Sequence, residues 1–157
     1  MKRFILMAGF VSLVFAGCKK TTTASTCTPV EPSTEEPAIV AFNTLKGYTA
    51  TKLPSGIYYQ IVNPGTGAQP TATSNVRAQY VGKLFDGTTF DSNYSLSGAS
   101  FNLSGVIQGW TIGVPLIKSG GTIRLMIPSK LAYGCSASGS VPANAPLFFE
   151  ITLLSVF

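Results

Sequence analysis

The sequence has no histidine among its 157 residues, and this absence removes several kinds of chemistry. A Ser-His-Asp triad, a Cys-His pair and histidine-ligated zinc all need an imidazole, as does most acid–base catalysis near neutral pH. Acidic residues are also scarce, six in total, and three of them lie together near the start: Glu31, Glu35 and Glu36. Paired-carboxylate catalysis and carboxylate-rich metal sites therefore have little to build on. We expect an activity without a strongly titrating catalyst, a metal or a cofactor.

Charge is low in general, because only 11% of the residues are charged. Glycine and proline together make up 26 residues, and 45% of the chain is hydrophobic. This mixture is too apolar for a disordered chain and too rich in loop formers for a helical bundle. The length is about that of one domain.

The first residues have the pattern of an export signal. Lys2 and Arg3 precede an apolar run over residues 4–17, which is too short to cross a bilayer as a helix. The run ends in FAGC at residues 15–18, which resembles the lipobox of bacterial lipoproteins. The resemblance implies a signal peptide over residues 1–17 and a lipid on Cys18. An ordinary cleaved signal, with Cys18 incidental, is the alternative.

The expected cleavage changes the meaning of the net charge and of the cysteines. Removing residues 1–17 takes away two positive charges, so the net charge falls from +5 to +3. The remaining lysines and arginines are scattered rather than interleaved with aromatics, so we expect no nucleic-acid partner. Of the three cysteines, Cys27 and Cys135 remain beside a lipidated Cys18. An exported compartment permits a disulfide between them, and two free thiols are the alternative.

The segment after the anchor is rich in Thr, Ser, Pro and Glu, which predicts a flexible tether over residues 18–37. Residues 38–54 form an N-terminal extension with a weak helical pattern. From residue 55 onward the pattern is that of β-strands, over residues 56–62, 75–84, 121–127 and 147–156. Asp86-Gly87 predicts a hairpin turn, and residues 109–117 allow a short helix that Pro115 should end or bend. Antiparallel strands packed across one short helix indicate a small α+β domain.

Aromatic residues gather near the turns and strand ends of this domain. They could form its core, or they could line an apolar pocket that contains a few polar groups. Five strings in this region resemble the FKBP-type peptidyl-prolyl isomerases, in that family's order: QYVGKL (79–84), DGTTFDS (86–92), VIQGW (106–110), AYG (132–134) and VPANAPLFFE (141–150). The resemblance covers about residues 55–157. It implies a curved antiparallel sheet of about five strands wrapped over one short helix.

The resemblance also implies a substrate pocket. The residues that it assigns to catalysis are Tyr80, Phe90, Asp91, Trp110, Tyr133 and Phe149. Those that it assigns to substrate binding are Val106, Ile107, Val141 and Phe101. Trp110 would form the floor, while the backbone N–H of Ile107 and the hydroxyl of Tyr133 would donate to substrate carbonyls. Asp91 would accept hydrogen bonds at the pocket edge.

The function implied is peptidyl-prolyl cis–trans isomerisation of exported proteins, by an apolar pocket without covalent or acid–base steps. The expected partners are proline-containing polypeptides and, through the lipid, the membrane of a bacterial cell envelope; we expect a monomer. Two alternatives stay open: a chaperone or binding module without turnover, and an anchored interaction protein that uses the same fold.

Overall fold

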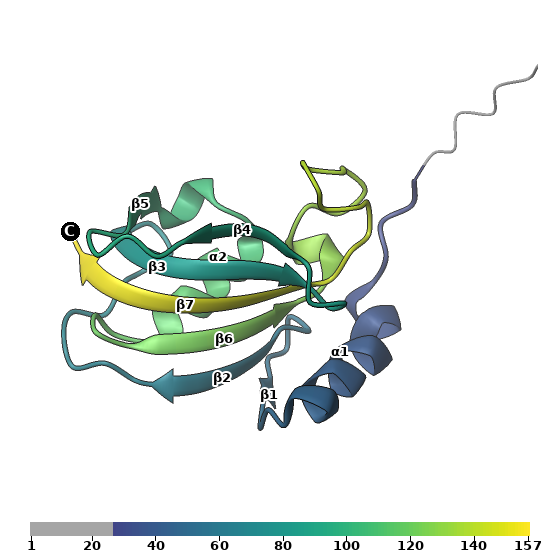
Figure 1. Cartoon of the computed structure of the whole chain (residues 1–157), viewed down its shortest axis with the longest axis horizontal. Coiled ribbons are helices and arrows are strands. Elements are labelled where there is room, and N and C mark those ends of the chain that lie inside the picture. The colour runs from purple at the N-terminus through teal and green to yellow at the C-terminus, as the bar shows by residue number, and fades with distance from the viewer. Residues whose placement is uncertain (1–26) are drawn as a thin grey trace, which may run out of the picture.

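The computed structural model describes residues 27–157, so the predicted signal peptide and Cys18 lie outside the described residues (Figure 1). Within them the chain forms α1 (Pro32–Lys46), β1 (Thr51–Lys52), β2 (Tyr58–Asn63), β3 (Asn75–Leu84), β4 (Thr89–Asn93), β5 (Ala99–Asn102), α2 (Gln108–Gly113), β6 (Thr122–Ile127) and β7 (Leu147–Val156). The described residues also form three short 3-10 helices: η1 (Leu103–Gly105), η2 (Val114–Leu116) and η3 (Ser129–Leu131).

The strands form one antiparallel sheet in the order β1-β2-β6-β7-β3-β4. β3 and β7 pair along almost their whole lengths and form the centre of the sheet. The outer edge of β3 pairs with β5 over its first half and with β4 over its second half. The sheet curls around α2, as Figure 1 shows. The β3–β4 connection contains the predicted Asp86-Gly87 turn, in which the Thr88 N–H donates to Asp86 Oδ1 at 2.8 Å.

The predicted α+β class is confirmed, with an antiparallel sheet wrapped over a short helix. The sheet has seven strands rather than about five because two short strands extend it. β1 has two residues and β5 has four, which is too short for an alternating pattern to stand out in the sequence. Helix α2 ends at Gly113, and Pro115 lies in the 3-10 helix η2 that follows it directly.

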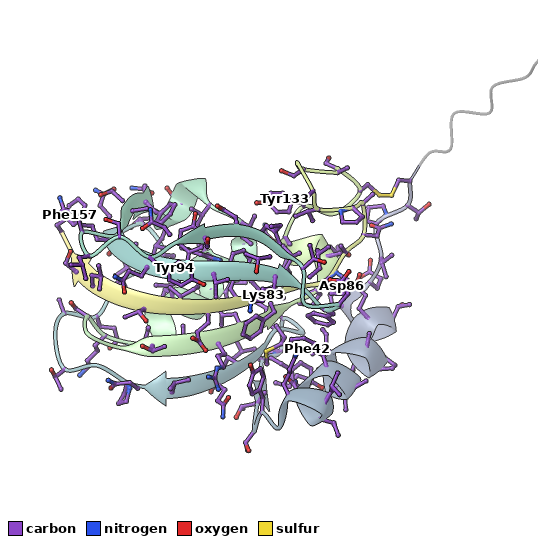
Figure 2. All side chains as sticks on the ribbon, viewed as in Figure 1. Phe42, Lys83, Asp86, Tyr94, Tyr133 and Phe157 are labelled. Carbon is purple, nitrogen blue, oxygen red and sulfur yellow. A yellow bond between two sulfur atoms is a disulfide. The ribbon has the colours of Figure 1, made fainter. Side chains whose placement is uncertain are left out.

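The main core lies between the sheet and α2. Successive residues of a strand point to opposite faces, so the odd-numbered residues of β6 and β7 face α2. Ile123, Leu125 and Ile127 of β6 and Phe149, Ile151 and Leu153 of β7 are accordingly buried there together with Trp110. The even-numbered Met126 and Phe148 point to the other face, where they pack against Ile39 and Phe42 of α1. Figure 2 shows Phe42 between α1 and the sheet.

The predicted boundary of the tether is wrong, because α1 begins at Pro32 within the stretch assigned to a flexible tether. Pro32 lies at the start of the helix, where a missing N–H costs nothing, and Gly47 ends it with a left-handed φ of 67°. The helix is held by contacts distant in sequence: the backbone N–H of Ser129 donates to Glu35 at 2.7 Å, and Lys130 pairs with Glu31 at 2.6 Å. Thr and Glu composition alone does not reveal such contacts.

The structure also resolves the alternative left open for two cysteines. Cys27 and Cys135, which are 108 positions apart in sequence, form a disulfide with their Cα atoms 5.5 Å apart. The first described residues are therefore joined covalently to the loop that follows η3.

Candidate active site

Helix α2 approaches the sheet closely through two glycines, and this approach places Trp110 under the sheet. A Cβ atom on Gly109 would lie 2.5 Å from a side-chain carbon of Ile127, and one on Gly113 would lie 2.5 Å from a side-chain carbon of Leu125. Only glycine permits backbone and side chain to come so near. Trp110 lies between the two glycines in sequence and is 4% exposed.

Three aromatic rings surround the indole of Trp110. The ring centroids of Tyr80, Phe101 and Phe149 lie 5.2, 5.2 and 5.4 Å from that of Trp110, all in edge-to-face geometry. Such pairs contribute about 0.5–1.5 kcal/mol each beyond the area they bury. The rings come from β3, β5 and β7, which are neighbours in the sheet. The walls are thus held by regular structure rather than by loops.

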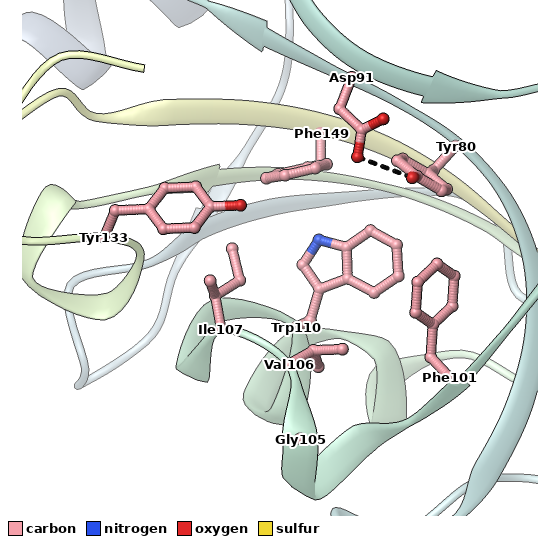
Figure 3. A pocket seen from close by; sticks show the side chains of 9 residues that line it. All are labelled: Tyr80, Asp91, Phe101, Gly105, Val106, Ile107, Trp110, Tyr133 and Phe149. Carbon is pink, nitrogen blue, oxygen red and sulfur yellow. Dashed lines mark hydrogen bonds between the residues drawn. The ribbon is translucent and has the colours of Figure 1, made fainter. Parts of the chain in front are cut away.

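These rings line a cavity of about 220 Å³ (Figure 3). Its lining residues are Tyr80, Asp91, Phe101, Gly105, Val106, Ile107, Trp110, Tyr133 and Phe149. Eight of the ten residues that the sequence assigns to the site are among them. Gly105 is the addition: it contributes backbone only, so no side-chain pattern in the sequence could have indicated it.

The two remaining residues, Phe90 and Val141, do not line the cavity. Phe90 packs edge-to-face on Phe149 with 5.5 Å between ring centroids, so it supports a wall of the pocket. Both rings fit because the facing residue on β3 is Gly82, on which a Cβ atom would lie 2.6 Å from Phe90 and 2.7 Å from Phe149. Val141 is 3% exposed and belongs to the main core. The structure therefore places Phe90 behind a wall of the pocket and Val141 in the core.

The indole N–H of Trp110 is a buried donor without a hydrogen-bond partner among residues 27–157. Figure 3 shows this nitrogen directed toward the side of the pocket that Ile107 and Tyr133 share. Leaving a buried donor unsatisfied costs about 1–3 kcal/mol, which a bound acceptor would recover. Ile107 itself is the N-cap of α2, where no side chain caps the helix. The first N–H groups of a helix lack acceptors within it, and Ile107, at the start of α2, lines the pocket.

Asp91 brings the one carboxylate of the pocket. Its Oδ2 accepts a hydrogen bond of 2.7 Å from the hydroxyl of Tyr80. Burial, and next the hydrogen bond to Asp91, raise the pKa of Tyr80 from 10.0 to about 12. Tyr80 therefore stays neutral at physiological pH and remains a donor to the carboxylate.

Tyr133 lies two residues after η3, at the edge opposite Phe101 in Figure 3, and its hydroxyl points into the pocket. The pocket thus combines an apolar floor and walls with donors at one rim and an acceptor at another. Within the described part of the chain, no three Cys, His, Asp or Glu side chains gather as metal ligands would. The arrangement can hold a small apolar ring and fix a carbonyl beside it, which needs no proton transfer.

The sequence of this domain matches a family model. The match covers residues 67–154, and the family is described as FKBP-type peptidyl-prolyl cis-trans isomerase. The chain belongs to this family. The fold, the aromatic pocket and the resemblance in five sequence strings all lie in or around the matched region.

Curated relatives are similar over the same domain. An FKBP-type peptidyl-prolyl cis-trans isomerase FkpA of Aeromonas hydrophila is 48% identical over 103 residues, which are 65% of this chain and 38% of the relative. The outer membrane protein MIP of Legionella longbeachae is 43% identical over 106 residues, which are 66% of this chain and 46% of the relative. This chain therefore matches less than half the length of either relative.

Solved structures share the fold. A peptidyl-prolyl cis-trans isomerase from Pseudomonas syringae pv. tomato has a TM-score of 0.67 at 34% identity, over 82% of this chain and 98% of that one. FkpA from Escherichia coli has a TM-score of 0.70 at 38% identity, over 80% of this chain and 59% of that one. Among the described residues, no helix combines the length and apolar character that a membrane span requires.

Proposed function

We propose that this chain is a peptidyl-prolyl cis–trans isomerase that assists the folding of exported proteins. The observation that carries the proposal is the aromatic cavity of about 220 Å³, with the unpartnered indole N–H of Trp110 inside it. A proline ring is apolar and compact, and the carbonyl beside it is the kind of acceptor that this donor lacks. Family membership supports the same reaction.

The reaction suits a pocket without acids and bases. Rotation about an X–Pro bond breaks amide resonance, against a barrier of about 18–20 kcal/mol, and takes tens to hundreds of seconds unaided. The twisted amide is less polar than the planar one, so an apolar pocket with fixed donors binds the twisted form better. A thousandfold acceleration requires about 4 kcal/mol of this preference. The donors at Trp110, Tyr133 and the start of α2 would supply it together with the apolar walls.

The experiment is the refolding of a protein whose slow step is prolyl isomerisation, with the purified chain in catalytic amounts. Wild type should accelerate the slow phase, and Trp110→Leu should abolish the acceleration because it removes the floor and the buried donor. The proposed isomerase function is refuted if both wild type and Trp110→Leu leave the slow phase at its uncatalysed rate.

A chaperone or binding module without turnover is the second candidate. The observation in its favour is the connection between β4 and β5, where Leu96 is 94% and Tyr94 is 68% exposed. Exposed apolar side chains of this size can hold unfolded segments. Suppression of client aggregation without any acceleration of the slow phase would favour this candidate.

We also propose that the chain is held at the bacterial cell envelope by a lipid on Cys18. The FAGC string at residues 15–18 supports this, as does the Cys27–Cys135 disulfide, since disulfides persist in exported compartments. Cys18→Ser should move the protein from the membrane fraction to the soluble fraction. Retention of that variant in the membrane would exclude a lipid anchor at Cys18.

A further inference from the structure

The described N-terminal residues contact the chain on both sides of Tyr133. Before Tyr133, the backbone N–H of Ser129 donates to Glu35 Oε2 at 2.7 Å, and Glu35 is only 8% exposed. After it, Cys135 is joined to Cys27 by the disulfide. Figure 2 draws the disulfide as a yellow bond between the N-terminal segment and the loop that carries Tyr133. A segment that lies outside the pocket thus contacts the chain just before and just after the residue that closes one side of it.

Two further contacts strengthen this connection. Lys130, three residues before Tyr133, pairs with Glu31 at 2.6 Å. Asn144 donates from Nδ2 to the carbonyl of Thr28 at 3.1 Å. Asn144 has a φ of 55°, a left-handed backbone that Asn tolerates better than other side chains. Residues 27–36 therefore bind η3 and both ends of the following loop.

The loop over residues 134–146 has few anchors of its own. Residues 136–140 are exposed, while Val141 is buried in the main core and Ala145 packs against that core. Many of its backbone hydrogen bonds stay local: the Ser136 N–H donates to Tyr133, and Ser138 and Val141 bond each other. A loop with local hydrogen bonds and small exposed side chains moves readily unless something outside it holds it. The contacts from residues 27–36 lie at both ends of this loop, where they would restrict its motion.

We propose that residues 27–36 act as a brace that positions Tyr133 at the pocket, through the Cys27–Cys135 disulfide on one side and the Glu35–Ser129 hydrogen bond on the other. The inference rests on the proposed isomerase function, since Tyr133 is expected to donate to the substrate carbonyl. Cys27, Cys135 and Glu35 are positioning residues in this scheme. A consequence is that the activity depends on the redox state of the disulfide. A dithiol reductant supplies two electrons and two protons, releases two thiols on the chain and is itself oxidised to a disulfide.

The experiment compares oxidised and reduced protein in two backgrounds, wild type and Tyr133→Phe. In wild type, reduction should lower kcat/KM for a proline peptide about fivefold, the rate equivalent of one ordinary hydrogen bond. In Tyr133→Phe, reduction should change kcat/KM by less than about twofold, because the hydroxyl to be positioned is already absent. An equal loss in both backgrounds, or none in wild type, would overturn the proposal.

Two variants keep the test decisive if the reduced protein unfolds, which far-ultraviolet circular dichroism would reveal. Asn144→Gly removes the contact to Thr28 but leaves the disulfide and the left-handed backbone intact. Introduced into the wild-type chain, it should lower kcat/KM. Introduced into the Tyr133→Phe chain, it should leave kcat/KM unchanged. Glu35→Ala should lower kcat/KM, and Glu35→Gln should restore most of it, since the amide oxygen can accept from Ser129. Equal kcat/KM in Glu35→Ala, Asn144→Gly and wild type would contradict the brace.

Amide hydrogen exchange separates failure of the brace from failure of the proposed function. The N–H of Gly134 donates to Ser129, and the N–H of Asn144 donates to Gly134. Reduction should accelerate exchange at these two amides while the amides of β3 and β7 stay protected. If the protein has no isomerase activity but reduction still accelerates exchange at these two amides, the proposed function is refuted and the brace is supported. Unchanged exchange at both amides would refute the brace whatever the activity.

Discussion

The hydrogen bond between Tyr80 and Asp91 offers the sharpest test of how the pocket works. Tyr80→Phe removes the hydroxyl that donates to Asp91 Oδ2 at 2.7 Å and leaves the ring in contact with Trp110 and Phe149. The floor and walls of the pocket therefore stay in place. What changes is the orientation of the one carboxylate at the edge.

The magnitude follows from the partner and its exposure. A hydrogen bond to a charged group contributes about 1.5–3 kcal/mol when it is shielded from water. Asp91 is exposed, so water and salt compensate part of the loss. We therefore expect a loss of about 1 kcal/mol of transition-state stabilisation, which is about a fivefold fall in kcat/KM.

The chain provides a matched control. Tyr58 on β2 donates to Glu36 at 2.6 Å, and this hydrogen bond is the main cause that raises the pKa of Tyr58 to about 12, the same value as for Tyr80. Tyr58 packs with the α1 face of the sheet, away from the pocket. Tyr58→Phe removes the same kind of hydrogen bond and should leave kcat/KM within about twofold of wild type.

The assay is the isomerisation of a proline tetrapeptide by Tyr80→Phe, Tyr58→Phe and wild type, with urea unfolding of each protein in parallel. Equal kcat/KM in Tyr80→Phe and wild type would refute the role given to Asp91. A fall of the same size in both variants would show that the effect comes from stability rather than from the pocket.

Three further predictions concern packing, pH and the disulfide. Gly82→Ala should lower the free energy of unfolding by about 1–3 kcal/mol in urea, because the new methyl group forces Phe90 and Phe149 apart. Gly105→Ala is its control, since a Cβ there meets no atom within 4 Å; an equal loss would contradict the packing argument. Tyr80 binds its proton more tightly in the folded protein than in the unfolded chain, so protonated Tyr80 stabilises the fold. This stabilisation is complete below about pH 10, the ordinary pKa of tyrosine, and is lost as the pH rises through about 12. The kcat/KM profile should be flat from about pH 6 to about pH 9, and a bell-shaped profile there would contradict a mechanism without acid–base steps. Reduction of the Cys27–Cys135 disulfide, which joins residues 108 apart, should cost about 2–5 kcal/mol of stability, and an unchanged melting temperature would contradict this.

The regular part of the fold was predictable because its signals are local. The alternation over residues 75–84 and 147–156 predicts β3 and β7 with their observed bounds, and Asp86-Gly87 predicts the turn between β3 and β4. Helix α1 was not predictable in the same way. It is stabilised by Ser129 and Lys130, more than ninety residues away, and by packing on Met126 and Phe148.

The site shows the same division between local pattern and distant contact. The resemblance in five strings named eight of the residues that line the cavity. It also named Phe90, which packs behind Phe149, and Val141, which lies in the core. Glycine has no side chain to read, so Gly105 was missed, and so was the role of Gly109 and Gly113 in seating Trp110. The pairing of Cys27 with Cys135 depends on where two loops meet in space, which spacing alone does not determine.

The central claim is that an apolar pocket built around Trp110 speeds rotation about an X–Pro bond. Exchange spectroscopy by NMR on a proline peptide tests it directly, because cis and trans signals are followed at equilibrium without a coupled protease. With catalytic amounts of wild type, we predict exchange within about a second or faster, against tens to hundreds of seconds unaided. Trp110→Leu should return exchange to the unaided rate, while Tyr58→Phe should not. Exchange at the unaided rate with wild type, or full activity in Trp110→Leu, would contradict the claim.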